Sequence, residues 1–297
     1  MNLPEFLASA DPKLQKVILA FAEAAKQIDA EVRTHSTEVA GSQNEFGDEQ
    51  LALDVFADQV VFEELEKSGV VAVAASEEQS EEKVLNEKGE FTTACDPLDG
   101  SSLVDVNLAV GTIFGIWHGK KIIGKTGRDM VAAGYAVYGP RTTFVIAIDS
   151  KPAEFTLQRN GEWDLTLEKM EIGEGKLFAP GNLRACAENK EYLTLLDFWA
   201  ENGYQLRYSG GMVPDIHQIL IKGKGIFSYP GSESCPAKLR LVYECAPLAY
   251  VVEKAGGASS DLEKSILDQE IQNLEQRTVV ALGSKEEVDR FNKFLTI

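Results

Sequence analysis

The sequence predicts a layered α/β fold in which helices and sheets are stacked in one compact unit. Two N-terminal segments, residues 11–32 and 51–67, carry apolar side chains at helical spacing. Short runs rich in β-branched and aromatic residues follow as far as residue 148, and the second half alternates helix-like and strand-like segments. A mixed order of this kind is typical of domains built from stacked helix and sheet layers.

The first predicted helix begins at Asp11 and Pro12, where a capping side chain precedes a proline at the first helical position. Apolar residues then recur along one face, at Leu14, Val17, Ile18, Phe21, Ala25, Ile28 and Val32. A polar, glycine-containing stretch over residues 36–50 predicts a mobile loop. A second helix is expected over residues 51–67.

Two of the strand candidates in the first half lead directly into acidic residues. Residues 70–75 precede Ser76, Glu77 and Glu78, and residues 91–95 precede the string Asp-Pro-Leu-Asp-Gly-Ser-Ser at 96–102. Further strands are expected over residues 110–117, 132–138 and 142–148.

The second half predicts helices over residues 192–202, 214–222 and 246–254, with strands near 225–228 and 278–282. The last helix is expected to start with a capping box, Ser284 and Glu287, and to end near Leu295. A soft boundary near residues 161–174 would divide the chain into halves 1–165 and 166–297.

The composition is that of an ordinary globular protein, with 44% hydrophobic and 26% charged residues among 297. The formal net charge of -18 disfavours nucleic acid and anionic membranes as partners. The negative charge would also repel a phosphorylated substrate unless bound cations offset it. A metal site is therefore worth considering among the acidic residues. We see no signal peptide and no membrane-spanning run, so a cytoplasmic location is expected, or an organelle if a targeting segment was trimmed.

The four cysteines, Cys95, Cys186, Cys235 and Cys245, show neither CxxC nor metal-finger spacing. We expect free thiols in a reducing compartment, although a redox switch is left open.

The string at 96–102 places two carboxylates, Asp96 and Asp99, three residues apart at the end of a strand. Proline between them fixes the chain, and such hard oxygen ligands suit Mg2+ or Mn2+, with the Leu98 carbonyl as a further ligand. Gly100 permits a tight turn after which the amides and hydroxyls of Ser101 and Ser102 can hold a phosphate. The alternative is a simple polar turn.

Glu77 and Glu78 are neighbours on an extended chain, so their side chains point in opposite directions. One could bind a metal ion while the other reaches a water molecule. The alternative is a solvated charge pair.

Taken together, these motifs resemble the lithium-sensitive, metal-dependent sugar phosphatases, and among them the class I fructose-1,6-bisphosphatase family. The resemblance extends to residues 110–115, 210–213 with Asp215, 225–227, 238–244 and 253–257, in family order over nearly the whole chain. It implies an αβαβα sandwich whose N-terminal half binds metal and phosphate and whose C-terminal half binds the sugar.

The resemblance also implies roles for individual residues. Two or three Mg2+ ions, or Mn2+, would be held by Glu77, Asp96, the Leu98 carbonyl, Asp99 and Glu244. The attacking water would be activated by Asp54 and Glu78, with Asp48 as a further acid, and Arg240 would stabilise developing charge.

Substrate contacts follow in the same way from the family pattern. The transferred phosphate would lie on Gly100, Ser101 and Ser102, and the sugar on Gly210, Gly211 and Met212. The distal phosphate would be held by Lys176, Arg207, Tyr208, Tyr229 and Lys238. The family counterpart of Arg207 crosses from a neighbouring subunit, which implies a homodimer or homotetramer.

Several stretches are more similar to sedoheptulose bisphosphatases than to the fructose enzymes: 127–129, 138–143, 180–185, 209–215, 259–261 and 265–268. We therefore expect hydrolysis of the 1-phosphate of sedoheptulose 1,7-bisphosphate, leaving open a fructose or dual-specificity enzyme. Gly173 and Lys176 stand where the fructose enzymes use Asn and Tyr, so contact by Gly173 is not expected, and Arg184 is a further candidate cation.

Inhibition by AMP is not expected. The animal fructose enzymes use a Lys-Tyr pair where this chain has Glu90 and Phe91, and the segment at 11–13 lacks the expected Thr and Glu. The redox CxxxxC of chloroplast sedoheptulose enzymes is also missing from the sequence.

Two rival functions have sequence signatures of their own. Inositol monophosphatases and nucleotide 3′-phosphatases usually carry a late Trp-Asp, whereas the late acid here is Glu244 in Tyr-Glu-Cys. A non-catalytic relative would have lost a ligand acid. None of the matching acids is replaced in this sequence.

Overall fold

The structure, a computed structural model, describes residues 1–34, 39–43 and 49–296. Its larger sheet has the strand order β10-β9-β8-β7-β6-β5-β3-β4. These strands are β3 (Val71–Ser76), β4 (Lys83–Val84), β5 (Phe91–Asp99), β6 (Val110–His118), β7 (Met130–Tyr138), β8 (Thr142–Ala147), β9 (Ala153–Leu157) and β10 (Trp163–Leu167). Strands β3 and β5 pair in parallel, and the other neighbouring strands of this sheet are antiparallel.

A smaller sheet in the second half has the order β12-β11-β13-β15-β14. Its strands are β11 (Leu177–Pro180), β12 (Gln205–Leu206), β13 (Ile226–Tyr229), β14 (Ala258–Ser260) and β15 (Val280–Gly283). Alternate residues of a strand point to opposite faces of the sheet. Ile226 and Phe227 accordingly belong to different hydrophobic clusters, one on each face.

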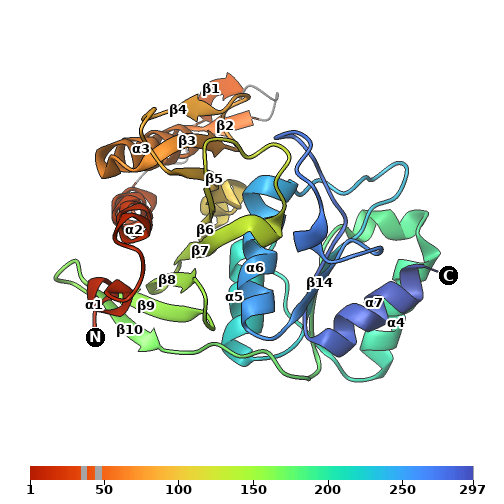
Figure 1. Cartoon of the computed structure of the whole chain (residues 1–297). Coiled ribbons are helices and arrows are strands. Elements are labelled where there is room, and N and C mark those ends of the chain that lie inside the picture. Colours follow the sequence, from red (N-terminus) through yellow and green to blue (C-terminus); the bar gives the residue numbers. More distant parts are fainter. Residues whose placement is uncertain (35–38, 44–48, 297) are drawn as a thin grey trace.

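Three layers of helices enclose the two sheets (Figure 1). On the outer face of the large sheet lie α1 (Leu3–Leu7), α2 (Pro12–Val32) and α3 (Ala52–Ser68). Between the sheets lie α5 (Met212–Lys222) and α6 (Ala246–Lys254), and on the far face of the small sheet lie α4 (Lys190–Glu201) and α7 (Lys285–Leu295). The order of layers is αβαβα, which confirms the predicted fold.

Helix α2 forms where its caps and its apolar stripe predict it. The Asp11 side chain accepts hydrogen bonds from the N–H groups of Lys13 and Leu14, at 2.8 and 3.0 Å, and Pro12 opens the helix. Phe21 on its buried face stacks on Phe114 of β6, with ring centroids 4.2 Å apart. This packing fixes the outer helical layer on the large sheet.

Two local predictions were wrong. Part of the predicted loop at 36–50 is an antiparallel hairpin, β1 (Val39–Gln43) and β2 (Glu49–Leu51), in which pairing satisfies the backbone. Helix α7 begins after Ser284 but has no capping box. Ser284 instead donates to the Gly173 carbonyl at 2.6 Å, and Glu287 accepts from Trp199 at 2.9 Å.

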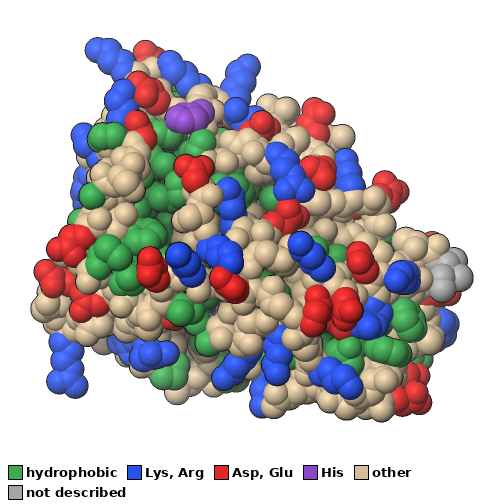
Figure 2. All heavy atoms as spheres, turned by 60° about the horizontal axis from the view of Figure 1, so that its bottom comes forward, with side chains coloured by type: hydrophobic (Ala, Val, Ile, Leu, Met, Phe, Trp, Pro, Cys, Tyr) green, Lys and Arg blue, Asp and Glu red, His purple; other side chains and the backbone are tan. Residues whose placement is uncertain are grey.

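The surface view in Figure 2 shows lysine, arginine, aspartate and glutamate side chains interspersed over the face it draws. On that face the excess of negative charge is therefore not gathered into one patch. Among the described residues, no helix has the length and apolar character needed to span a bilayer.

The middle helix α5 contains a largely buried histidine that contacts the large sheet. The Nδ1 of His217 lies 3.1 Å from the Tyr135 hydroxyl of β7, and its Nε2 lies 3.6 Å from the buried Glu154 carboxylate of β9. Burial, together with the nearby Arg141 cation, lowers the pKa of His217 to about 4. The imidazole is therefore neutral at pH 7, and its Nδ1 shares a hydrogen bond with the Tyr135 hydroxyl.

Because the pKa of His217 is lowered on folding, its contribution to stability is present above its unfolded pKa and lost as pH falls toward about 4. We expect one of the three histidines to stay neutral down to about pH 4 in an NMR titration of the imidazole nitrogens. In His217→Gln, the loss of thermal stability on acidification below pH 6.5 should be smaller than in the wild type. Titration of every histidine near pH 6.5 would contradict this assignment.

Candidate active site

Glu77 and Asp96 are brought together by the parallel pairing of β3 with β5. Both strands end at the same edge of the sheet, and the register aligns Ser76 with Cys95. The N–H of Glu77 also donates to the Cys95 carbonyl at 3.1 Å. The two acids that follow the aligned residues are therefore neighbours.

A β-bulge separates Asp96 from Asp99 at the end of β5. The strand was predicted to end at Cys95 but continues through Asp99, and its register with β6 shifts between the two acids. Pro97 lies in this irregular stretch, where the lack of an N–H breaks no ladder bond, and its carbonyl accepts from Thr112 at 2.8 Å. The bulge lets Asp96 and Asp99 reach different partners.

The third acid, Glu244, comes from a π-helical turn, η4 (Leu241–Cys245), just before α6. Its carboxylate accepts a 2.6 Å hydrogen bond from the N–H of Arg240. Carboxylate oxygens of Glu77, Asp96 and Glu244 lie within 4.8 Å of one another. Single π turns are frequent at functional sites because they redirect one side chain within a helix.

Burial and mutual repulsion make this cluster unfavourable without a cation. Desolvation raises the pKa of Asp96 well above its ordinary value, and the charges of Glu77, Asp99 and Glu244 raise it further. The pKa of Glu244 is raised in the same way, first by burial and then by Glu77 and Asp99. Buried oxygen ligands arranged like this fit a hard divalent cation, which would favour the ionised carboxylates.

Arg240 supplies a positive charge beside the cluster. Its side chain is 4% exposed and forms an ion pair with Glu77. Its Nε lies 3.4 Å from Glu275, a residue that belongs to none of the sequence motifs. The guanidinium is thus held between an acid of the cluster and an acid outside it.

Asp99 connects the cluster to the start of α5. Its carboxylate accepts hydrogen bonds from the N–H groups of Met212 and Val213, at 3.3 and 2.7 Å. Burial raises the pKa of Asp99 to about 7, against the lowering effect of these two bonds. Asp99 therefore fixes Met212, the predicted sugar contact, and its role as a metal ligand remains a prediction.

Leu98 has a structural role besides its predicted carbonyl ligation. Its N–H donates to Asp96 Oδ1 at 2.9 Å, and its side chain is buried in the outer core. The orientation of the Asp96 carboxylate is therefore set within the strand itself.

The predicted phosphate cradle lies directly against the predicted sugar segment. Gly100 has φ 76°, and a Cβ on it would come within 3.3 Å of the Cα of Gly211. The short helix η1 (Ser101–Val106) follows, with Ser101 half-buried and Ser102 exposed. Gly210, with φ 105°, precedes Gly211, the N-cap residue of α5.

Asp215 belongs to a motif singled out in the sequence, although no role was assigned to it. Its Oδ1 accepts from the N–H of Ser209 at 2.8 Å, and burial raises its pKa to about 6. This hydrogen bond holds the turn of Ser209 to Gly211 against the first turn of α5. The backbone at the start of α5 is thus positioned by two carboxylates: Asp215 accepts from an N–H before Gly211, and Asp99 accepts from N–H groups after it.

The predicted distal-phosphate residues lie in more exposed positions. Arg207 and Lys238 are exposed, and Tyr208 and Tyr229 are partly exposed. Lys176 donates to the Asn202 carbonyl at 2.9 Å, at the end of α4. Their contact with substrate remains a prediction.

The predicted water-activating acids are described only in part. Asp54 is buried in the first turn of α3, and Glu78 is half-buried, with its N–H 3.2 Å from Ser76 Oγ. Asp48 lies outside the described residues. The structure adds Asp58, which accepts from Gln79 at 2.7 Å and whose pKa is raised by burial.

The comparisons with known proteins cover the whole chain. The family model for the fructose-1-6-bisphosphatase N-terminal domain matches residues 4–168, and that for the C-terminal domain matches residues 172–296. The chain belongs to the fructose-1,6-bisphosphatase family. It is therefore an enzyme of the phosphatase class, a bisphosphatase that hydrolyses phosphate esters.

Individual relatives carry two names within this family. The chain is 50% identical to the chloroplastic sedoheptulose-1,7-bisphosphatase of Spinacia oleracea, over 99% of this chain and 78% of that protein. It is 46% identical to the class 1 fructose-1,6-bisphosphatase of Trichlorobacter lovleyi, over 95% of this chain and 90% of that one. A crystal structure of a putative sedoheptulose-1,7 bisphosphatase from Toxoplasma gondii superposes with a TM-score of 0.94 at 36% identity, covering 100% and 98% of the two chains.

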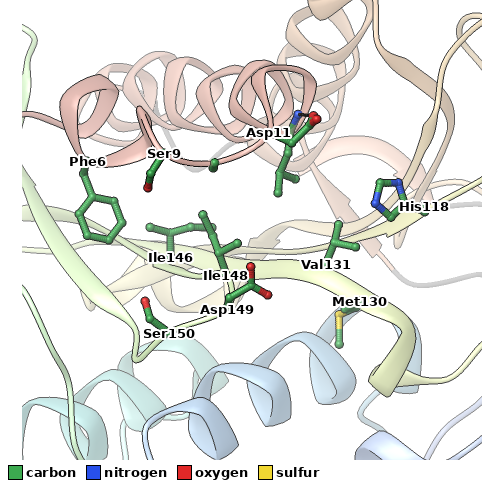
Figure 3. Close-up of a pocket in the computed structure, with 12 residues that line it drawn as sticks. Phe6, Ser9, Asp11, His118, Met130, Val131, Ile146, Ile148, Asp149 and Ser150 are labelled. Carbon is green, nitrogen blue, oxygen red and sulfur yellow. Dashed lines mark hydrogen bonds between the residues drawn. The ribbon is translucent and has the colours of Figure 1, made fainter.

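A cavity of about 600 Å³ lies away from the carboxylate cluster, between the N-terminal helices and the large sheet (Figure 3). Asp11, at the start of α2, and Asp149, after β8, line it together with His118 and apolar side chains. Asp11 already accepts hydrogen bonds from the first amides of α2. An anionic ligand would meet carboxylates here instead of free amides.

We therefore expect AMP neither to bind nor to inhibit this bisphosphatase. A thermal-shift titration should show no change in the midpoint at millimolar AMP, with Mg2+ held constant. Clear stabilisation by AMP that Asp11→Ala enhances would show that the cavity accepts a nucleotide.

Proposed function

We propose that this bisphosphatase is a Mg2+-dependent enzyme that hydrolyses the 1-phosphate of sedoheptulose 1,7-bisphosphate. The observation that carries the proposal is the cluster of Glu77, Asp96 and Glu244, whose carboxylate oxygens lie within 4.8 Å of one another. Such a site binds hard cations. A bisphosphate needs them because its negative charges are repelled by those of the acidic chain.

The chain's own residues would divide the chemistry among them. Bound Mg2+, two or three ions per subunit, or Mn2+, would neutralise phosphate charge and lower the pKa of a bound water. Asp54 and Glu78 are the proposed acceptors of the proton of the attacking water. The amides and hydroxyls of Gly100 to Ser102 would hold the phosphoryl oxygens, because positioning and electrostatics dominate phosphoryl transfer.

Arg240 is the proposed cation for the charge that develops on the transferred group. In the structure it forms an ion pair with Glu77 and lies near Glu275, so it is held beside the cluster. The sugar would lie against Gly210, Gly211 and Met212. The distal phosphate would be held by the exposed cations and tyrosines described above.

The seven-carbon substrate is favoured by the sequence stretches that resemble sedoheptulose enzymes and by the name of the spinach relative. A fructose or dual-specificity enzyme is the second candidate, favoured by the 46% identity to a class 1 fructose enzyme. Phosphate release from both bisphosphates, measured side by side with Mg2+, gives the ratio of kcat/KM. We expect the ratio to favour the sedoheptulose substrate, and a clear preference for fructose 1,6-bisphosphate would reverse the assignment.

We also propose a homodimer or homotetramer. Next to the exposed Arg207, Leu206 and Tyr208 are 55% and 45% exposed. Apolar side chains beside a substrate cation are consistent with coverage by a second subunit. We also propose a cytoplasmic location. An organelle is the alternative, because the spinach relative is named as chloroplastic.

Asp99→Asn is expected to lower kcat by at least about a hundredfold at saturating Mg2+, because a proposed metal ligand beside the cluster loses its charge while the shape of the side chain is kept. The Mg2+ concentration for half-maximal rate should rise as well. Asp105→Asn, an exposed acid on η1, is the matched control and should behave as wild type. Near-normal turnover by Asp99→Asn would refute its assignment.

A further inference from the structure

Residues 230–238 form a loop that connects two predicted contact residues of the distal phosphate. Tyr229 ends β13 immediately before the loop, and Lys238 ends the loop two residues before Arg240. The loop contains no helix or strand. Its two ends touch, because a Cβ on Gly231 would lie 2.6 Å from the backbone nitrogen of Ala237.

A single buried side chain, Asn182, ties this loop to the adjacent sheet. Its Nδ2 donates to the Pro230 carbonyl at 2.8 Å and to the Cys235 carbonyl at 3.0 Å, so both amide hydrogens are used on the loop. Asn182 is 9% exposed, and its backbone is in the left-handed region, with φ 48° and ψ 44°. Asparagine is one of the few residues that tolerates this conformation.

Neighbouring contacts support the same attachment. Glu188 accepts a 3.0 Å hydrogen bond from the N–H of Ser234, and Asn189 donates to the Gly231 carbonyl at 3.2 Å. Gly181, just before Asn182, lies so close to Tyr229 that a Cβ on it would be 2.4 Å from the ring. The segment after β11 thus holds both the loop and the tyrosine that precedes it.

The Tyr229 hydroxyl is within electrostatic range of Glu244 in the carboxylate cluster and of two cations. Burial raises the pKa of Tyr229, the positive charges of Arg184 and Arg277 oppose this, and the charge of Glu244 adds to it. Lys238, at the end of the loop, is two residues before Arg240, which pairs with Glu77, so the region that Asn182 organises lies next to the cluster.

We propose that Asn182 is a positioning residue for the distal phosphate: its amide holds the loop of residues 230–238 so that Tyr229 and Lys238 meet that phosphate together. This inference rests on the proposed function, because it assumes a substrate with a second phosphate. Asn182 acts through the loop and does not itself touch the substrate.

Asn182→Asp tests the proposal directly. The substitution keeps the size and the backbone preference but turns carboxylate oxygens toward two carbonyl oxygens. We expect KM for the bisphosphate to rise about tenfold or more while kcat stays within about threefold, the pattern of lost uniform binding.

Two inhibitors separate positioning from general damage to the site. Sedoheptulose 7-phosphate probes the distal subsite, and its inhibition constant should rise in parallel with KM. Inorganic phosphate probes the metal side, and its inhibition constant should stay within about twofold of the wild-type value. Equal weakening of both inhibitors would show a merely structural role and overturn the proposal.

Asn160→Asp is the matched control, because Asn160 is exposed in the turn between β9 and β10, and it should leave all constants unchanged. If Asn182→Asp does not fold, Asn182→Gly serves as the test variant. Glycine adopts the left-handed conformation but lacks the side-chain amide that holds the loop. If folded Asn182→Gly has the KM of the wild type, the positioning role of Asn182 is overturned, while the proposed function still holds. Failure of the wild-type chain to hydrolyse either bisphosphate would instead overturn the proposed function.

Discussion

The repulsion among buried carboxylates is the constraint on which the rest of this structure depends. Glu77, Asp96 and Glu244 come from three separate elements, yet their oxygens lie within 4.8 Å of one another. Burial raises the pKa of Asp96 and Glu244, and each neighbouring carboxylate adds to that effect. Parallel strands, a bulge and a π turn hold the three side chains together in spite of this cost, and a bound cation would offset it.

The same constraint organises the substrate side. Asp99, on the far side of the bulge from Asp96, accepts hydrogen bonds from the first amides of α5. Helix α5 in turn lies between the two sheets, where His217 contacts Tyr135. The position of the predicted sugar segment is therefore coupled to the carboxylate cluster through one carboxylate and one buried helix.

Much of the fold was predictable from local patterns. The stripe from Leu14 to Ile28 and the cap at Asp11 predict α2, and the acids after two β-rich runs predict a carboxylate site at a sheet edge. The family resemblance then correctly indicated the αβαβα order of layers. It could do so because its motifs are spread over nearly the whole chain.

Other features depend on tertiary contacts that no local pattern reveals. Ser284 and Glu287 match a capping box, yet the buried donors of Trp199 and Tyr204 compete for the glutamate. The pairing of Glu275 with Arg240 joins residues 35 positions apart without any motif. Strands β9 and β10, in contrast, do have a local signal, because the Asn160-Gly161 pair between them is typical of a hairpin turn.

The most direct test of the account is to locate the cation itself. Crystals of the protein grown with Mn2+ should show anomalous scattering among the carboxylates of Glu77, Asp96 and Glu244, at oxygen distances of about 2.0–2.4 Å. Arg240 should then have moved from Glu77 toward Glu275. A Mn2+ peak elsewhere, with Arg240 still paired to Glu77 and the cluster empty, would contradict the account.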